Sequence, residues 1–543
     1  MLKSTDFIFK IFAGMLDIAS PRKKWGWIFL IVLAAVVLRS PAYFNPVIDE
    51  DEAWYATAAR VINNGGLLYR DAVDLKPPLI FYFYAFSFSI FGDDLRVLHG
   101  VTVIWVLTTA LVIARITSRL TEEAESPYLA AMLYVLFTPT FVPQALATNG
   151  EILMNLPLAL SVFWFLKSEP PPSIYSSSPV SFSQTGSLRC VFLSGIFCGL
   201  AFLFKYQSAI LFGVLLAYIL VIKPWLSHRR PEKAEFVQSL FLFGGFISVL
   251  AMLFGFFRYL GNWDDFYFWG WQYNFTFMRG FTGHFFFRRF FGLTPRFIFV
   301  WLILWFFALA AIKRALRFPR RIPAGDHLVI LWLAGSALAV CIGGKFFSHY
   351  FIQLLPPTAI LAGRSIVEWW RESKAIKFAK LKRSLAVAGI AIPPLIYLEV
   401  NWREELKRDR WVSQPIRSIS AEVQKLSSNK DKIFVWGRMP ELYYFSRRLP
   451  ASRFISFLVW MNSYDYREKN SAVNSDAFAP IEDLLLADLT RMRPKIIIDT
   501  APPDFRYFGK YTLSEFPRLQ NFVDKNYRLV RTIDRFEIYE SVL

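Results

Sequence analysis

The 543-residue sequence has little of what a disulfide-stabilised, zinc-binding or nucleotide-binding protein requires. Its three cysteines, Cys190, Cys198 and Cys341, all lie in apolar segments and imply no disulfide framework. Histidine and cysteine form no dense cluster that would indicate zinc. Neither G-x-G-x-x-G nor a P-loop is present, so we expect no nucleotide site. The sequence also lacks a clear internal repeat, which many transporters show.

Charged residues are also few: they make up 19% of the chain, against 55% hydrophobic and 18% aromatic residues. With a mean hydropathy of +0.36, this composition indicates a polytopic membrane protein. The formal net charge of +19 does not indicate nucleic acid binding. The basic residues lie in clusters between hydrophobic segments, where they set membrane topology.

Eleven apolar runs approach the length of about 20 residues that a membrane-spanning helix needs. They lie near 25–43, 97–117, 127–143, 152–167, 190–205, 207–223, 236–257, 294–312, 327–344, 349–366 and 384–400. The run 78–91 is too short, and we expect an aromatic helix in the outer interface. If it crossed the membrane, every later basic cluster would face outward, against the positive-inside rule. The pattern therefore predicts eleven spans, a cytoplasmic N-terminus and an outer C-terminus.

The character of the chain changes after residue 400. Residues 401–543 are polar, with short apolar segments at 433–436, 495–499 and 536–539 and a helix-like stretch at 480–492. Strands that alternate with helices predict a small α/β domain. We therefore expect an α-helical transmembrane domain, 1–400, and an extracytoplasmic α/β domain, 401–543.

The first predicted outer loop contains the most unusual chemistry. Four consecutive carboxylates, Asp49 to Glu52, are followed by Tyr55 and later by Lys76-Pro77-Pro78. Charge beside a membrane is costly unless it has a function. A carboxylate serves as a base or metal ligand, and a lysine holds a phosphate as a point charge. The loop thus indicates chemistry on a substrate with a lipid tail and a phosphate head group.

Further polar residues are predicted on the same side of the membrane. These are Glu151 just before a span, Lys205 at a turn, Arg258 before an aromatic stretch at 263–273, and Lys345, His349 and Tyr350 in a later loop. Aromatic faces stack on sugars, cations neutralise phosphate, and a carboxylate deprotonates an acceptor hydroxyl. The combination is typical of a site for a sugar carried on a lipid phosphate.

Each of these residues also has a simpler explanation. The acidic loop is then a solvated surface, Pro77-Pro78 a helix start, and Glu151 a favourable charge at a helix N-terminus. His349 is then a packing residue, the aromatic stretch an interfacial belt, and Lys345 and Arg258 anchors that extend to the interface. The convergence of several such residues on one face favours a site.

The order of motifs resembles the GT-C glycosyltransferases, closest to the protein O-mannosyltransferase and aminoarabinose (lipid A) transferase group. It rests on Asp51-Glu52-Ala53-Trp54-Tyr55-Ala56, Lys76-Pro77-Pro78-Leu79, the segment 199–205, the segment 348–357 and the segment 433–437. The resemblance implies a many-helix fold with an outward-facing site, a polyprenyl-phosphate-linked sugar donor and inversion at the anomeric carbon.

The resemblance also implies roles for individual residues. The family's catalytic aspartate corresponds to Asp51, with Glu52 beside it, and the phosphate-binding lysine to Lys76. The second acidic residue falls near Glu151. Asp49 competes for the first role because the acidic run can be aligned in two ways; Tyr55-Ala56 follows Asp51 at the family spacing and favours it.

A metal is not required by this pattern, although a divalent cation stays an open alternative. Leu75 stands where some relatives have an acidic residue before the lysine, which weakens the case for a metal there. We expect Lys76, helped by Arg258, Lys345 or Arg39, to stabilise the departing lipid phosphate. Asp51 then takes the proton of the acceptor hydroxyl. Tyr55, Asp49, His349 and Tyr350 complete the predicted substrate site.

Three other functions remain open at the level of sequence. One is a transporter or flippase of lipid-linked glycans, another a non-catalytic scaffold, and a third a glycan polymerase or ligase that uses diphosphate-linked donors. The expected partners of the enzyme are the lipid-linked donor, a lipid, glycan or protein acceptor, and membrane lipids, but no nucleic acid. The expected location is the inner membrane of a bacterium.

Overall fold

The computed structural model describes residues 21–169, 184–278, 283–319, 324–342, 344–373, 378–457 and 475–542. Contacts divide the chain into two compact units. The first, here called the helical unit, comprises Met1–Phe44, His99–Leu253 and His284–Trp402. The second, here called the mixed unit, comprises Asn45–Leu98, Phe254–Gly283 and Arg403–Leu543.

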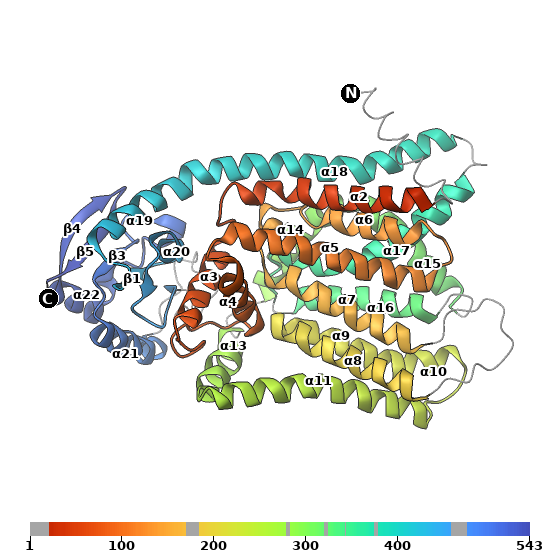
Figure 1. Cartoon of the computed structure of the whole chain (residues 1–543), viewed down its shortest axis with the longest axis horizontal. Coiled ribbons are helices and arrows are strands. Elements are labelled where there is room, and N and C mark those ends of the chain that lie inside the picture. Colours follow the sequence, from red (N-terminus) through yellow and green to blue (C-terminus); the bar gives the residue numbers. More distant parts are fainter. Residues whose placement is uncertain are drawn as a thin grey trace. The chain divides into compact units, whose positions relative to one another are not determined.

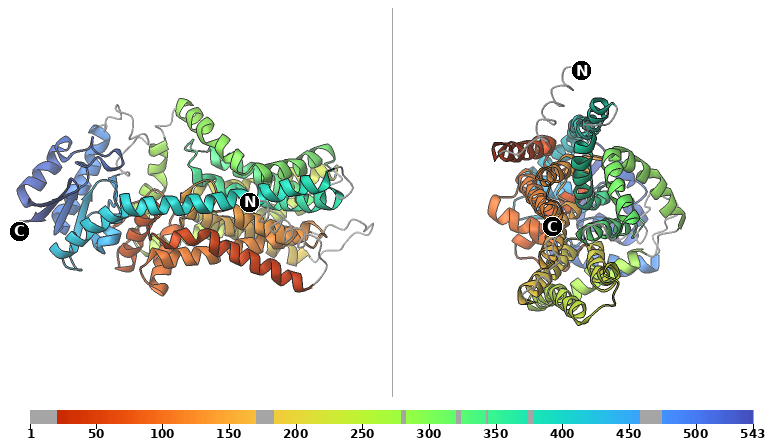
Figure 2. Two further views of the ribbon diagram at one scale, coloured as in Figure 1. Left: turned by 90° about the horizontal axis from the view of Figure 1, so that it is seen from above. Right: turned by 90° about the vertical axis from the view of Figure 1, so that its right-hand side faces the viewer.

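Long apolar helices build the helical unit, and they run side by side in both Figure 1 and Figure 2. Their bounds are α2 Pro21–Arg39, α5 Leu95–Leu120, α6 Ser126–Phe137, α7 Gly150–Ser168, α8 Gln184–Phe204, α9 Ala209–Ala217, α10 Lys223–Leu226, α11 Lys233–Tyr259, α14 Gly283–Val300, α15 Leu302–Arg317, α16 Ala324–Cys341, α17 Leu355–Glu372 and α18 Ala379–Arg408. Short turns of other helix types are η1 Ser40–Tyr43, η2 Pro143–Leu146, η3 Tyr206–Ser208, η4 Tyr218–Ile222 and η6 Ser348–Leu354.

Six helical segments in the described part of the chain are long and apolar enough to cross a membrane. They lie at Lys24–Tyr43, Leu95–Leu120, Gly150–Ser168, Tyr206–Leu226, Lys233–Tyr259 and Ala379–Arg408. Four shorter apolar helices accompany them: Leu79–Phe91, Ser126–Phe137, Leu188–Phe204 and Gly325–Cys341. The expected helical membrane architecture is present, and the number of eleven crossings stays a prediction.

The run 294–312 is not the continuous span that its hydrophobicity predicts. Helix α14 ends at Val300, α15 starts at Leu302, and the two are bent by 88°. Between them the backbone of Trp301 leaves the helical region, with φ −101° and ψ 21°. The Trp301 indole is buried, and its Nε1 donates to Thr140 Oγ1 at 2.9 Å. This tertiary contact accompanies the bend, which hydrophobicity alone does not predict.

Helices α8 and α11 approach closely at paired glycines. A Cβ atom on Gly195 would lie 2.1 Å from the carbonyl oxygen of Leu242, and one on Gly245 would lie 2.1 Å from that of Phe192. A Cβ atom on Gly199, one turn after Gly195, would lie 2.7 Å from the Cβ atom of the Val249 side chain. Small residues that let helix backbones approach are typical of packing between membrane helices.

The mixed unit combines helices with a five-stranded sheet. Its helical elements are α3 Glu50–Asn63, α4 Leu79–Phe91, α12 Trp263–Asp265, η5 Phe266–Gln272, α13 Tyr273–Met278, η8 Asp409–Ser413, α19 Gln414–Leu426, α20 Glu441–Ser446, α21 Ser475–Met492, η10 Phe505–Tyr507, η11 Leu513–Glu515 and α22 Pro517–Asn526. Its strands are β1 Lys432–Trp436, β2 Leu449–Pro450, β3 Ile496–Asp499, β4 Tyr527–Ile533 and β5 Phe536–Ser541.

The strand order in the sheet is β2-β1-β3-β5-β4. Strand β1 pairs in parallel with β2 and with β3, in register Ile433 to Ile496, whereas β5 pairs antiparallel with β3 and β4. Strand β3 is buried along its whole length and β1 over all but its first residue, as expected for central parallel strands. The predicted strands at 433–436, 495–499 and 536–539 are thereby confirmed.

The C-terminal segment does not form its unit alone. The division at Trp402 and Arg403 lies close to the predicted boundary at 400, yet residues 45–98 and 254–283 belong to the same unit. The run 78–91 forms α4, which packs on α3 through the rings of Phe81 and Tyr84 against Tyr55. Its place in the membrane interface stays a prediction.

Candidate active site

The acidic run forms the start of helix α3. Asp49 is its N-cap, with extended backbone, and its Oδ1 accepts the N–H of Asp51 at 3.3 Å. Acidic side chains in the first turn also face the positive end of the helix dipole. Burial, followed by the charges of Asp51 and Glu50, raises the pKa of Asp49 to about 7. Asp49 is therefore a capping group whose surroundings disfavour its charged form.

The next carboxylates along the run have separate partners. Glu50 forms ion pairs with Arg438 and, at 3.1 Å, with Arg506 Nη1. Glu52 is fully buried, and its Oε2 accepts the N–H of Ile48 at 3.0 Å. These contacts fix Glu50 and Glu52 within the fold, and the catalytic role of Glu52 stays a prediction.

Asp51 meets the two other functional side chains that the sequence indicates in this loop. Its Oδ1 lies 3.1 Å from Lys76 Nζ, and its Oδ2 accepts a long hydrogen bond of 3.4 Å from the Tyr55 hydroxyl. The Lys76 ammonium also lies 4.7 Å from the centre of the Tyr55 ring and 5.3 Å from that of Trp54. Asp51 and Lys76 are about one-third exposed, at 29% and 36%, so both are accessible to a substrate.

Three hydrogen bonds hold the backbone around Lys76. The Tyr69 hydroxyl donates to the carbonyl of Lys76 at 2.7 Å, and Asn274 Nδ2 donates to that of Leu75 at 2.8 Å. The N–H of Lys76 donates to Asp74 Oδ1 at 2.8 Å. Asp74 is buried, which raises its pKa above the ordinary value. Hydrogen bonds thus hold the backbone on both sides of Lys76, and they fix where its side chain begins.

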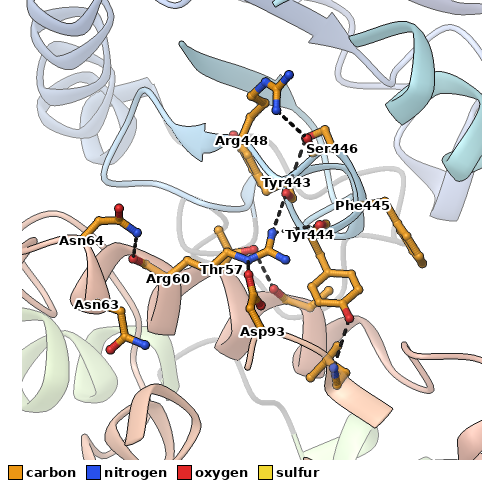
Figure 3. A network of polar contacts seen from close by, with 12 residues as sticks. Thr57, Arg60, Asn63, Asn64, Asp93, Tyr443, Tyr444, Phe445, Ser446 and Arg448 are labelled. Carbon is orange, nitrogen blue, oxygen red and sulfur yellow. Dashed lines mark hydrogen bonds and ion pairs between the residues drawn. The ribbon is translucent and has the colours of Figure 1, made fainter. Parts of the chain in front are cut away.

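The far end of α3 is anchored by Arg60, as Figure 3 shows. The Arg60 Nε lies 2.5 Å from Asp93 Oδ2, and its Nη1 donates to the carbonyls of Tyr443 and Tyr444 at 3.0 and 2.8 Å. The guanidinium also lies 4.7 Å from the centre of the Tyr444 ring. Arg60 is buried, so its charge is compensated almost entirely by these groups.

A second polar cluster lies in the helical unit. Asn149 caps α7, and its Oδ1 accepts the N–H of Ile152 at 3.0 Å. Glu151, in the first turn and only 2% exposed, forms an ion pair with Lys205. His349 Nε2 lies 3.8 Å from Glu151 Oε1, and the Lys205 ammonium lies 3.5 Å from the centre of the Tyr350 ring.

Three further predicted residues have other local surroundings. Arg258 is exposed in the last turn of α11, and Lys345 is partly buried between α16 and η6. Arg39 is buried, and its guanidinium donates to the carbonyls of Ala145 and Leu146 at 3.3 and 2.5 Å. Arg39 therefore holds backbone in the helical unit, and its predicted contribution to phosphate binding stays a prediction.

The geometry adds contacts that sequence reasoning did not assign. The sequence places Lys205 at an outer turn, but its pairing with Glu151 depends on the fold. Arg60, Arg438 and Arg506 carry no local signal, since their partners lie hundreds of positions away along the chain. Among the described residues, no group of three or more His, Cys, Asp or Glu side chains is arranged to hold a metal ion.

Comparisons with known proteins agree with this architecture. Residues 75–251 match the family model of dolichyl-phosphate-mannose-protein mannosyltransferases. The fold is similar to that of ArnT from Cupriavidus metallidurans, solved bound to undecaprenyl phosphate, with a TM-score of 0.62 and 15% identity over 95% of this chain and 98% of that one. No curated protein gives a significant match in sequence.

An archaeal enzyme shares the fold as well. The oligosaccharyltransferase AglB from Archaeoglobus fulgidus, solved with an inhibitory peptide and a dolichol-phosphate, gives a TM-score of 0.55 and 14% identity over 94% of this chain and 73% of that one. The fold is the GT-C fold that the sequence predicts. The family model that matches residues 75–251 and these similar structures all belong to glycosyltransferases. Within the class, it resembles the aminoarabinose transferase and protein mannosyltransferase group.

Proposed function

We propose that this protein is an inverting glycosyltransferase that moves a sugar from a polyprenyl-phosphate donor to an acceptor hydroxyl. The observation that carries the proposal is the contact of Lys76 with Asp51, 3.1 Å apart and both partly exposed. One cation suited to a lipid phosphate and one carboxylate suited to a hydroxyl proton thus stand side by side. The lipid phosphates bound in the similar structures support a donor of this kind.

Lys76 binds the donor phosphate in the proposed mechanism. The anionic phosphate competes with Asp51 for the Lys76 ammonium, which rotates on its fixed backbone toward the donor. Loss of this ion pair leaves the Asp51 carboxylate available to accept a proton. Tyr55 remains beside Asp51 and limits its rotation.

The transfer step forms one bond to the anomeric carbon and breaks another. The acceptor oxygen attacks from the face opposite the phosphate, and Asp51 takes its proton as general base. The bond from the anomeric carbon to the phosphate oxygen breaks, and its electron pair leaves with the polyprenyl phosphate. Lys76 stabilises that charge. Because the phosphate is already a good leaving group, no separate acid is required, in contrast to a two-carboxylate hydrolase.

The proposal includes the side of the membrane on which transfer occurs. Basic clusters between the apolar runs support a cytoplasmic N-terminus and an outward-facing site with an outward C-terminal domain. A bacterial inner membrane would then be the location, and an envelope lipid, a glycan or a protein hydroxyl the acceptor. On the family resemblance, Glu151 is proposed as a second acidic residue of catalysis, and His349 and Tyr350 are proposed as substrate-binding residues.

Donor class is tested with the purified protein in lipid vesicles. Polyprenyl monophosphate sugars and diphosphate-linked glycans, both radiolabelled, are offered separately, and release or transfer of the label is measured. We expect turnover of a monophosphate donor. Turnover of diphosphate donors alone would indicate a polymerase or ligase, and label crossing the bilayer without release would indicate a flippase.

Phosphate binding by Lys76 is tested in the same vesicles. Lys76→Ala should weaken binding of the undecaprenyl phosphate by on the order of tenfold or more, because a charge-assisted contact is lost. Lys430→Ala, at an exposed position in the C-terminal segment, is the matched control. Unchanged affinity in Lys76→Ala would remove this residue from the donor site.

A further inference from the structure

The small sheet of the mixed unit places two arginines at the edge where such sheets commonly bind ligands. Strand β1 lies between β2 and β3, and all three are parallel. The chain continues from β1 to β2 on one side of it, and then to β3 on its other side. This reversal of strand order makes a topological switch point outside the carboxyl ends of β1 and β3. Arg438 follows β1 by two residues, and Arg506 lies in η10 after β3.

These arginines hold the first turn of α3. Both form ion pairs with Glu50, the residue next to Asp51. Arg506 also pairs with Glu441 at 2.5 Å and donates to the carbonyl of Arg438 at 2.7 Å. Arg438 and Glu441 are buried, at 8% and 3% side-chain exposure, so this network is largely removed from solvent.

The network is balanced in charge and specific in geometry. Two carboxylates, Glu50 and Glu441, meet two guanidinium groups in a mostly buried place, where an uncompensated charge would be costly. Burial alone would lower the pKa of Arg506, but Glu441 and Glu50 outweigh it and keep that pKa above the ordinary value. Arg506 therefore remains a cation at any pH at which the protein is folded.

Local backbone structure fixes where the arginines lie. Gly437, between β1 and Arg438, has φ 146°, and a Cβ atom there would lie 1.8 Å from Thr500 Oγ1. Thr500 donates both its N–H and its hydroxyl to the carbonyl of Trp436, at 3.0 and 2.9 Å. Arg506 itself has a left-handed backbone, with φ 56°. The ends of β1 and β3 are thus held together by hydrogen bonds, and this fixes the backbone from which the Arg438 and Arg506 side chains extend to Glu50.

We infer that Arg438 and Arg506 are positioning residues for glycosyl transfer: by holding Glu50, they fix the first turn of α3 so that Asp51 faces Lys76. Arg60 holds the last turn of the same helix to the carbonyls of Tyr443 and Tyr444. The C-terminal segment therefore contacts both the first and the last turn of α3. This inference rests on the proposed function, because it assigns a purpose to the orientation of Asp51.

The test compares Arg438→Met and Arg506→Met with Arg528→Met, a control in which the arginine is 69% exposed. In the full-length protein in lipid, amide hydrogen exchange of the peptide 50–55 should accelerate in the first two variants and not in the control. The rate of transfer at saturating donor should fall on the order of tenfold to a hundredfold, because misplacement of a reacting group by about 1 Å has this effect. The KM for the donor should change little.

Conservative and double variants distinguish a positioning role of the arginines from a general loss of folded structure. Lysine at 438 should restore much of the rate, whereas lysine at 506 should not, because only the guanidinium fork joins Glu50 to Glu441. The double variant Glu50→Gln with Arg506→Met should be no slower than the slower single variant, as expected for residues that act through each other.

Two results would overturn the inference. One is unchanged exchange of the peptide 50–55 in both arginine variants. The other is faster exchange with the saturating rate within about twofold of the wild type, since a positioning loss is expected to be much larger. If the wild type transfers no sugar from any lipid-linked donor, the proposed function fails instead. The exchange measurement still decides whether the arginines hold α3.

Discussion

The four carboxylates from Asp49 to Glu52 have almost the same chemistry but different environments. Asp49 caps α3, Glu50 pairs with two arginines and Glu52 accepts a backbone N–H in a fully buried place. Asp51 faces a lysine and a tyrosine at a partly exposed position. This division of roles favours Asp51 over Asp49 as the proposed base, in agreement with the preference for Asp51 that the spacing to Tyr55-Ala56 gave.

Removal of the Tyr55 hydroxyl tests the immediate surroundings of Asp51. The hydrogen bond is long, 3.4 Å, so Tyr55→Phe should lower the saturating transfer rate only modestly, by about twofold to tenfold, as for loss of one hydrogen bond. Steady-state kinetics with a radiolabelled lipid-linked sugar give the rate. A loss as large as that of Asp51→Asn would mean that Tyr55 itself takes part in the chemistry.

The raised pKa of Asp49 predicts a dependence of stability on pH. The folded pKa of about 7 lies above the ordinary value of 3.8, so the folded state holds this proton more tightly than the unfolded state. Its contribution to stability is therefore fully present below about pH 4 and is lost as the pH rises to about 7. Asp49→Asn keeps a good N-cap and removes the titration.

Thermal unfolding in detergent between pH 4 and pH 8 measures this contribution. The midpoint of Asp49→Asn should gain on the wild type as the pH rises and level off above about pH 7. Asp264→Asn, at an exposed position in α12, should show no such trend. A constant difference between Asp49→Asn and wild type would contradict the assigned titration.

At the scale of elements, the sequence predicts those whose signal is local. The central strands β1 and β3 and the helix α21 coincide with the apolar segments that indicated them. The sequence did not predict the two-residue strand β2 or the mostly exposed strand β4, because neither shows an apolar pattern. The bend at Trp301 also escaped, since apolar residues continue across it.

The contact of α8 with α11 predicts a sharp difference between two glycines. Gly245→Ala places a methyl group against the Phe192 carbonyl, whereas Gly213 in α9 has open space around a new Cβ. Gly245→Ala should therefore lower the free energy of unfolding by about 1–3 kcal/mol, as overpacking does. Gly213→Ala should leave it unchanged or slightly higher. Thermal unfolding in lipid or detergent measures both, and equal midpoints would contradict the close approach.

At the scale of the whole molecule, three distant stretches of sequence form the mixed unit. Arg60 and the carbonyls of Tyr443 and Tyr444 are separated by more than 380 positions, so no local pattern can predict their contact. The sequence did indicate Asp51 and Lys76, because the acidic run and Lys-Pro-Pro are unusual locally. Arg60, Arg438 and Arg506 could not be assigned, because ordinary surface arginines look the same in a sequence.

Because distant segments form one unit, we expect that a substitution in one segment destabilises the others as well. Arg60→Met leaves the carbonyls of Tyr443 and Tyr444 without their donor, which should cost about 1–3 kcal/mol. Asp93, 40% exposed, is left to water. Hydrogen exchange should accelerate together in the peptides that cover α3 and α20. Arg96→Met, which removes an exposed arginine paired locally with Asp94, is the control. Faster exchange confined to α3 would show that the stretches do not form one cooperative unit.

The most direct test of the proposed chemistry is transfer of a radiolabelled sugar from polyprenyl phosphate by purified protein in lipid. Wild type, Asp51→Asn and Asp264→Asn are compared, each shown to be folded by its thermal transition. If Asp51 is the base, the wild type and Asp264→Asn turn over, and Asp51→Asn is slower on the order of 100-fold or more. Transfer by Asp51→Asn at a rate close to that of the wild type would contradict the account.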